Sequence, residues 1–252
     1  MKTIDINCDM GESFGRFVVG SDETIFPYIT RCNIACGFHG GDPLHIDQTI
    51  RMALENKVRI GAHPSYPDLM GFGRRRMSMH PVEVRSIVRY QVAAIKSLTE
   101  SLGGKLHHVK PHGALYNTSV DDSETALAII EAVQSFGPDI YLMGLAGSMV
   151  ESLAGDQDIP FLAEAFADRK YAPDGRLQSR SAADSVIADP AEAVAQVLSI
   201  VLKHEVRTTD GSTIPVRAQS ICVHGDNPSA VPILRALTKA LAEVEHKQSD
   251  LS

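Results

Sequence analysis

Short apolar runs alternate along the sequence with longer segments in which apolar residues recur with a helical period. Short runs of β-branched and aliphatic residues predict buried strands, and the longer period predicts amphipathic helices. The predicted strands cover residues 3–8, 32–36, 58–63, 106–110, 140–146, 160–167 and 220–225. Because each is followed by a longer periodic segment, the pattern favours a parallel sheet with helical crossovers.

Helices are predicted over residues 42–56, 81–104, 122–136, 190–204 and 229–246. Asp42 is the expected N-cap of the first, with Pro43 at its first helical position. Its apolar stripe comprises Ile46, Ile50, Ala53 and Leu54. In the second helix the predicted buried face comprises Val84, Val88, Gln91, Ile95, Leu98 and Leu102, and the pattern stops at Gly103 and Gly104.

These elements predict one α/β domain spanning residues 1–252, an irregular (β/α) barrel of about seven parallel strands. A closed or nearly closed barrel is the first interpretation, and a doubly wound open sheet is the second, since alternation alone does not decide closure. Residues 206–218 break the alternation and predict a hairpin around Asp210 and Gly211. The polar stretch 168–189 is interpreted as a functional loop or lid.

Composition narrows the class of protein. The 252 residues are 44% hydrophobic and 22% charged, with a formal net charge of −7, which is typical of a globular protein that does not bind nucleic acid. The basic triplet 74–76 is isolated in a glycine-containing loop and is interpreted as a solvated loop, with anion binding as the alternative. No secretory signal or apolar run of about 18 residues is present, so no membrane association is expected. Four cysteines without a CxxC pair suggest reduced, buried thiols and a cytoplasmic location.

Polar residues gather where the predicted strands end. In β/α barrels chemistry takes place at the carboxyl ends of the strands, so these residues are the candidate site. They are Asn7, Asp9 and Glu12 at the first strand, Asn33 and His39 at the second, His63 at the third, Lys110, His112 and Tyr116 at the fourth, Glu164 and Arg169 at the sixth, and His224 and Asp226 at the last. Glycines around His39 would let the backbone turn tightly beside a ligand.

Structural roles compete with these assignments. Lys110 would equally fill the barrel as the ion-pair partner of Glu164, and Asp9 would equally brace the first loop. Cys36 and Cys222 lie in apolar strands and are expected in the core. His107 and His108 precede the fourth strand's carboxyl end and are expected to be structural.

The candidate set permits two chemistries. The groups would bind a divalent metal and activate water, or would perform acid/base catalysis without a metal, with Lys or His stabilising an oxyanion. The sequence does not separate these options. It contains no HExxH, no GxSxG, no GxxxxGK[ST] and no GxGxxG after a strand, which disfavours several common hydrolase and nucleotide-binding classes.

Six motifs carry a family resemblance. They are "IDINCDMGESFG", "CNIACGFHGGDP", "IGAHPSYPDLMGFGRR", "VKPHGALYN", "EAFADRKY" and "ICVHGDNP". In this order they resemble the LamB/YcsF family, whose members form the A subunit of prokaryotic 5-oxoprolinase. The likeness runs from Asp5 to about Leu241.

The resemblance implies a barrel akin to the glycoside hydrolase/deacetylase barrels. It implies ATP-dependent ring opening of 5-oxo-L-proline (pyroglutamate) to L-glutamate, in a complex with two further subunits, B and C. ATP would be a co-substrate of the complex. Which subunit binds ATP, and whether a divalent metal takes part, remain open.

On this basis we hypothesise roles for the candidate residues. Asp9 and Glu164 are bases or metal ligands, and the four strand-end histidines are acid/base groups or ligands. Lys110 and Arg169 stabilise anionic oxygen or hold the substrate carboxylate. The remaining residues contact substrate or orient partners, namely Asn7, Glu12, Asn33, Tyr116 and Asp226. Two rival functions are a metal-dependent deacetylase of an N-acetylated carbohydrate and a non-catalytic lactam-binding subunit.

Overall fold

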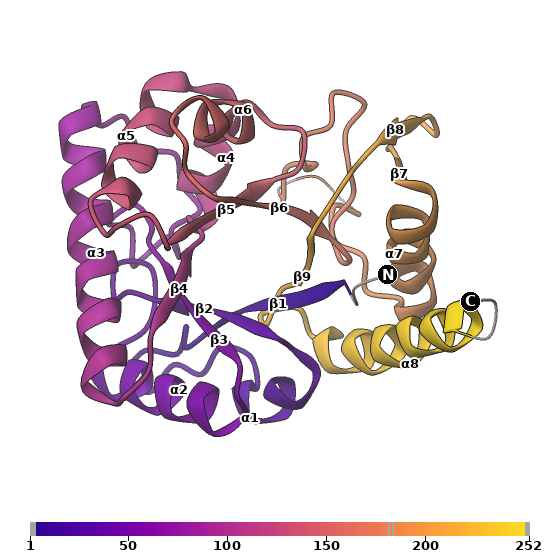
Figure 1. The fold of residues 1–252 in the computed structure, drawn as a ribbon, viewed down its shortest axis with the longest axis horizontal. Coiled ribbons are helices and arrows are strands. Elements are labelled where there is room, and N and C mark those ends of the chain that lie inside the picture. Colours follow the sequence, from indigo (N-terminus) through magenta and orange to yellow (C-terminus); the bar gives the residue numbers. More distant parts are fainter. Residues whose placement is uncertain (1–3, 181, 183, 250–252) are drawn as a thin grey trace.

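Seven parallel strands form a closed barrel in the computed structural model, which describes residues 4–180, 182 and 184–249 (Figure 1). The strands are β1 (Asp5–Met10), β2 (Arg31–Ala35), β3 (Arg59–His63), β4 (Leu106–Val109), β5 (Tyr141–Leu145), β6 (Phe161–Phe166) and β9 (Ser220–Val223). The last strand pairs in parallel with both β6 and β1. The predicted barrel is therefore confirmed, and the open doubly wound sheet is wrong.

Helices surround the barrel and bury its outer face (Figure 1). They are α1 (Asp22–Ile25), α2 (Pro43–Glu55), α3 (Pro81–Ser101), α4 (Gly113–Asp121), α5 (Ser123–Gln134), α6 (Met149–Asp156), α7 (Pro190–Lys203) and α8 (Ala230–Ser249), with a 3₁₀ turn η1 (Phe26–Tyr28). Between β6 and β9, the antiparallel pair β7 (Glu205–Arg207) and β8 (Thr213–Pro215) lies outside the barrel. The hairpin expected around Asp210 is thus confirmed.

Alternation along β1 explains why the barrel has a polar interior. Ile6, Cys8 and Met10 are buried in the apolar core that the helices cover. The intervening residues hydrogen-bond across the inside: Asn7 Nδ2 donates to Ser220 Oγ at 2.8 Å. Because successive strand residues point to opposite faces, one strand builds both the outer core and the inner polar column.

The ends of α2 follow from local chemistry. The Asp42 carboxylate accepts hydrogen bonds from the backbone N–H groups of Leu44 and His45, and Pro43 occupies the first turn. Both expectations for this helix are confirmed.

The buried face of α3 includes Val88 and Ile95, but Leu98 is 37% exposed. The prediction that Leu98 belongs to that face was wrong, because the helix turns it away from the barrel.

Three α-helices were not predicted, the first of which is the short α1. Helix α4 begins at Gly113, directly after β4, where the sequence suggested only a strand-end loop. Helix α6 is eight residues long and was missed because its apolar pattern is short. In the described part of 168–189 there is no helix, and the segment is held by isolated bridges such as Arg169–Val186 and Tyr171–Leu177.

The four cysteines are free and buried, as predicted. Among the described residues, no helix combines the length and the apolar character needed to cross a bilayer.

The two faces of α3 provide a stability test. We expect Ile95→Ala to lower the free energy of unfolding by about 2–5 kcal/mol, because Ile95 is fully buried and leaves a cavity. Leu98→Ala, on the same helix, should cost less than about 1 kcal/mol. Urea denaturation measures both. Equal losses would contradict the assignment of Leu98 to the solvent side.

Candidate functional site

A cavity of about 780 Å³ lies at the carboxyl ends of the barrel strands. Its lining includes Asp9, His63, Arg74, Lys110, His112, Tyr116, Phe166, Arg169, Arg176, Arg180 and His224. The cavity brings together residues from the carboxyl ends of β1, β3, β4, β5, β6 and β9 and from the 168–189 segment, so it is the candidate active site.

The Lys110 ammonium group is buried at the base of this site. Its Nζ lies 2.8 Å from Glu164 Oε1, 3.1 Å from Asp9 Oδ1 and 3.1 Å from Cys222 Sγ. The Lys110 side chain is 3% exposed, so the charge is held by paired carboxylates rather than by water. Cys222 lies in the buried core, as predicted, and its thiol also contacts Lys110.

These contacts fix the charge states of Lys110 and Asp9. Burial alone would lower the pKa of Lys110, but Asp9 and Glu164 hold it well above its ordinary value. Burial alone would raise the pKa of Asp9, but His63 and Lys110 hold it well below its ordinary value. Lys110 is therefore a cation and Asp9 an anion at neutral pH.

Glu164 lies beside Lys110 in the barrel. It is the fourth residue of β6, within the predicted strand 160–167, and is completely buried inside the barrel. The Tyr116 hydroxyl donates to Glu164 Oε2 at 3.0 Å. Burial and the nearby carboxylate raise the pKa of Tyr116 well above its ordinary value. Tyr116 is thus a neutral donor that orients Glu164 toward Lys110.

A layer of amides and one imidazole supports Asp9 from below. Asn33 Nδ2 donates to Asn7 Oδ1 and to Asp9 Oδ1, both at 2.8 Å. His108 Nε2 lies 2.8 Å from Asn33 Oδ1 and is fully buried. His108 therefore belongs to the network under the site, which is a structural role, as predicted. Its position follows from the strand, since His108 shares the face of Lys110 two residues later.

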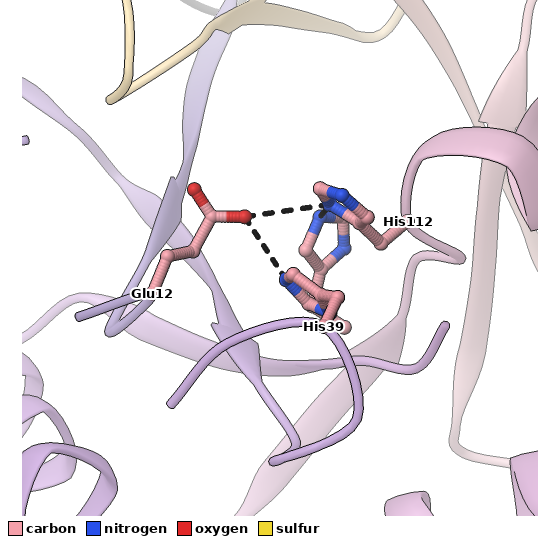
Figure 2. A group of neighbouring side chains, drawn as sticks. Glu12, His39 and His112 are labelled. Atoms are coloured by element: carbon pink, nitrogen blue, oxygen red, sulfur yellow. Dashed lines mark hydrogen bonds and ion pairs between the residues drawn. The ribbon is translucent and has the colours of Figure 1, made fainter. Parts of the chain in front are cut away.

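Glu12 and three histidines form a second group at the mouth, which we call the Glu12–histidine cluster (Figure 2). Its members are Glu12, His39, His63 and His112. Glu12 Oε1 lies 3.0 Å from His39 Nε2 and 3.4 Å from His112 Nδ1. The rings of His39 and His112 stack with centroids 3.7 Å apart. Glu12 was assigned to substrate binding, but its contacts are with the histidines.

Burial dominates the electrostatics of the Glu12–histidine cluster. It raises the pKa of Glu12 well above its ordinary value, and the charge of Asp9 adds to this effect. It lowers the pKa of His39 and His112 well below the ordinary value, aided by the neighbouring histidines. Neutral imidazoles beside a carboxyl group are a donor set that suits a divalent metal ion.

Two glycines allow the loops of this cluster to pack together. A Cβ on Gly40 would lie 2.6 Å from the carbonyl oxygen of Glu12. Gly73 has φ of +63°, and a Cβ there would lie 2.8 Å from both the His39 Cβ and the His112 ring. Only glycine permits this close approach.

His224 forms a dyad with Asp168 on the opposite side of the cavity. His224 Nδ1 donates to Asp168 Oδ1 at 2.8 Å, and the His224 backbone N–H donates to Asp168 Oδ2 at 3.1 Å. Asn227 Nδ2 donates to the same carboxylate at 3.2 Å. This arrangement fixes the imidazole tautomer and leaves Nε2 as the acceptor nitrogen. Asp168 follows the sixth strand, but it was not among the predicted site residues.

Arginines make the outer part of the cavity positively charged. Asp226 pairs with Arg74 and with Arg180 Nη1, the latter at 3.3 Å. Arg169 is 4% exposed, and its Nη2 donates to the carbonyl of Gln178 at 2.5 Å. Its Nε is buried without a hydrogen-bond partner in the described part of the protein. Burial and the charge of Arg180 lower the pKa of Arg169 to about 10. The region is suited to an anionic ligand.

The predicted site residues therefore occupy one region in two layers. Those that line the cavity are Asp9, His63, Lys110, His112, Tyr116, Arg169 and His224. Those that support the lining residues are Asn7, Glu12, Asn33, His39, Glu164 and Asp226. Arg74 was missed because the basic triplet looked isolated. Its partner, Asp226, lies 152 positions away in the sequence.

The comparisons with known proteins agree over nearly the whole sequence. The model of the LamB/YcsF family matches residues 4–252. The sequence is 48% identical to the A subunit of 5-oxoprolinase from Geobacillus thermodenitrificans, and the match covers 96% of this protein and 94% of that one. It is 46% identical to the A subunit of 5-oxoprolinase from Pyrococcus horikoshii, where the match covers 95% of this protein and 94% of that one.

Solved structures support the same fold. A lactam utilization protein from Thermus thermophilus is 43% identical and superposes with a TM-score of 0.90, over 96% of this protein and 97% of that one. A putative cellobiose-phosphate cleavage protein from Enterococcus faecalis has a TM-score of 0.55 at 11% identity, over 95% of this protein and 93% of that one. The second likeness concerns the fold alone.

The close packing at Gly73 can be tested against a matched glycine. Gly15 has φ of +56°, but no atom lies within 4 Å of the place that a Cβ would occupy there. We expect Gly15→Ala to cost about 1 kcal/mol of unfolding free energy from backbone strain alone. Gly73→Ala should cost at least about 1 kcal/mol more, because it also displaces His39 or His112. Equal losses in urea denaturation would contradict the proposed contact.

The Asp168–His224 dyad predicts a pH dependence of stability. Burial alone would raise the pKa of Asp168, but His224 holds it below its ordinary value. A carboxyl whose pKa is depressed by folding stabilises the fold above its unfolded pKa of about 4, and this stabilisation is lost as the pH falls.

The unfolding free energy of the wild type should therefore fall more steeply below about pH 4 than that of Asp168→Asn. Urea denaturation of both proteins between about pH 2 and pH 5 measures the slopes. Parallel curves would show that Asp168 has no depressed pKa.

Proposed function

The protein belongs to the LamB/YcsF family, and we propose that it acts as the A subunit of a 5-oxoprolinase. In this proposal the lactam ring of 5-oxo-L-proline is opened by water to give L-glutamate, while ATP is converted to ADP and phosphate. The 5-oxoprolinase subunits B and C are the proposed partners. The observation that carries the proposal is the cavity itself, where a buried ammonium group, a His–Asp dyad and only partly neutralised arginines meet.

A requirement for ATP follows from the chemistry of the substrate. A five-membered lactam is an unstrained amide, and its carbonyl carbon is a poor electrophile. Transfer of a phosphoryl group to the amide oxygen would activate that carbon toward water. Breaking the C–N bond would then leave an acyl phosphate, and a second water would hydrolyse it to glutamate and phosphate. An active site for the reaction therefore needs cationic groups for anionic oxygen, a base for water and a proton source for the ring nitrogen.

Lys110 is suited to stabilise the lactam oxygen. Its pKa is held well above the ordinary value, so it does not act as a base at neutral pH. It lies in the lining of the cavity and is fixed by Asp9 and Glu164. A preorganised cation of this kind stabilises negative charge that develops on oxygen in the transition state.

His224 is suited to move the protons. Asp168 accepts a hydrogen bond from the Nδ1–H group of His224, so the Nε2 of His224 is free to accept a proton from the attacking water. The same nitrogen would then return a proton to the ring nitrogen as the C–N bond breaks. Asp168 is a positioning residue in this scheme, because it contacts the imidazole and not the substrate.

Asp9 is better suited to positioning than to base catalysis. A carboxylate with a strongly depressed pKa is a weak base at neutral pH. Its two oxygens lie near Lys110 Nζ and, at 3.3 Å, near His63 Nε2. We therefore assign Asp9 to holding these two groups in place and retain His224 as the proposed base.

The arginines are assigned to the carboxylate of the substrate. 5-Oxoproline is an anion at neutral pH, and Arg74, Arg169 and Arg180 all line the cavity. Asp226 neutralises part of the charge of Arg74 and Arg180, whereas Arg169 Nε has no hydrogen-bond partner among the described residues. Arg169 is therefore the residue with most capacity to bind an added carboxylate.

The assembled complex provides the test. The protein is combined with subunits B and C, and glutamate release from 5-oxoproline is measured with and without ATP. We expect His224→Gln to lower turnover at saturating substrate by about a hundredfold or more, the usual effect of losing an acid/base group. His204→Asn is the control, because His204 is exposed at the left-handed end of α7, a conformation that Asn tolerates.

Each alternative predicts a different result. If His224→Gln changes only the affinity for 5-oxoproline, the protein is a lactam-binding component of the complex. If the wild-type complex opens the lactam equally well without ATP, the ATP-dependent mechanism is wrong. Release of acetate from an N-acetylated carbohydrate by the isolated protein would favour the deacetylase function.

A further inference from the structure

The side chains of the Glu12–histidine cluster lie closer to one another than residues that only line a cavity need to. One ligand atom from each of its four residues lies within 4.8 Å of every other, and all four residues are buried. They come from separate places in the fold: the ends of β1, β3 and β4 and the loop after β2. In Figure 2 the Glu12 carboxylate points at the imidazoles of His39 and His112.

Backbone carbonyls determine which nitrogens of the cluster carry hydrogen. His63 Nδ1 lies 2.6 Å from the carbonyl oxygen of Lys110, and His112 Nε2 lies 2.9 Å from that of Phe72. A carbonyl only accepts, so each of these outer nitrogens donates an N–H. In a neutral imidazole the inner nitrogen then carries a lone pair. A carbonyl on the outer nitrogen is the arrangement found behind metal-binding histidines.

The inner nitrogens point at one another. His63 Nε2 and His112 Nδ1 are 2.9 Å apart, so two lone pairs would face each other at hydrogen-bond distance. Glu12 Oε1 lies on the same side, 3.0 Å from His39 Nε2, and Asp9 Oδ2 lies 3.3 Å from His63 Nε2. A single shared proton would satisfy only one of these contacts. One divalent cation would satisfy all four groups together.

We propose that the Glu12–histidine cluster binds one divalent transition-metal ion of the Zn²⁺ type. Three imidazole nitrogens and one carboxylate oxygen favour Zn²⁺, Co²⁺ or Mn²⁺ over Mg²⁺ and Ca²⁺, which prefer all-oxygen sites. His63 and His112 also line the cavity, so the ion would lie beside the substrate. This inference does not depend on the proposed 5-oxoprolinase activity.

A second group of residues with possible metal-ligating atoms already contacts a cationic side chain. Asp9, Cys222 and His224 also have ligand atoms within 4.8 Å of one another. However, Lys110 Nζ lies 3.1 Å from both Asp9 Oδ1 and Cys222 Sγ, so an ammonium group already supplies the positive charge there. A divalent cation at that point would be repelled by Lys110. Of the two groups found among the described residues, we therefore assign the metal to the Glu12–histidine cluster.

The experiment measures metal content directly. The purified full-length protein is stripped with a chelator, dialysed against Zn²⁺, Co²⁺ or Mg²⁺, freed of unbound ion and analysed by mass spectrometry. We expect about one equivalent of Zn²⁺ or Co²⁺ and less than about a tenth of an equivalent of Mg²⁺. Visible absorption of the Co²⁺ form reports imidazole and carboxylate coordination.

Variants locate the bound ion. Glu12→Gln and His112→Gln should each weaken Zn²⁺ binding at least about tenfold, whereas His224→Gln and His204→Asn should retain it. Circular dichroism confirms that each variant is folded. Metal content does not depend on catalysis, so a failure of the proposed function leaves this result unchanged.

Two results would overturn the proposal. One is a folded wild-type protein that retains less than about a tenth of an equivalent of Zn²⁺ and of Co²⁺, which would make the cluster a proton-sharing network. The other is full retention of the ion by Glu12→Gln and His112→Gln but its loss from His224→Gln, which would place the ion at the group that Lys110 occupies.

Discussion

A buried ammonium group between two carboxylates is the constraint on which this barrel depends. Removing the Lys110 charge from water is costly, and Asp9 and Glu164 must both approach it closely to offset that cost. The two carboxylates come from β1 and β6, and Lys110 follows β4. The closed arrangement of the strands is thus coupled to the assembly of the site, because a shift of one residue in either strand would turn its carboxylate away.

The site has two sides that differ in their chemistry. Neutral imidazoles and Glu12 lie on the side of β2 to β4, and the arginines and the His224–Asp168 dyad lie on the side of β6 and β9. Lys110 lies between the two sides. On the second side it contacts Glu164 of β6 and Cys222 of β9 directly. A small anionic substrate in the cavity would therefore contact a fixed cation at its centre, arginines at one end and imidazoles at the other.

Strand positions were predictable from the sequence because apolar runs of four to eight residues end in polar motifs. The alternation of strands and helices did not by itself decide whether the barrel closes. Closure depends on the pairing of β9 with both β6 and β1, and an apolar run does not show which strands will lie next to it. The candidate residues were found through their position at strand ends. Asp168 and Arg74 were missed because each acquires its role from a partner distant in sequence.

The pairing of the first strand with the last has a consequence for how the protein is made. The Asn7 side chain bonds to Ser220, 213 positions later in the sequence. Without β9 the other six barrel strands would form an open sheet with two unpaired edges, so closure must wait until β9 has been synthesised. Long-range closure of this kind is slow compared with helix formation. The cavity at the carboxyl ends of the strands is therefore complete only once β9 and the residues after it, including His224, have been added.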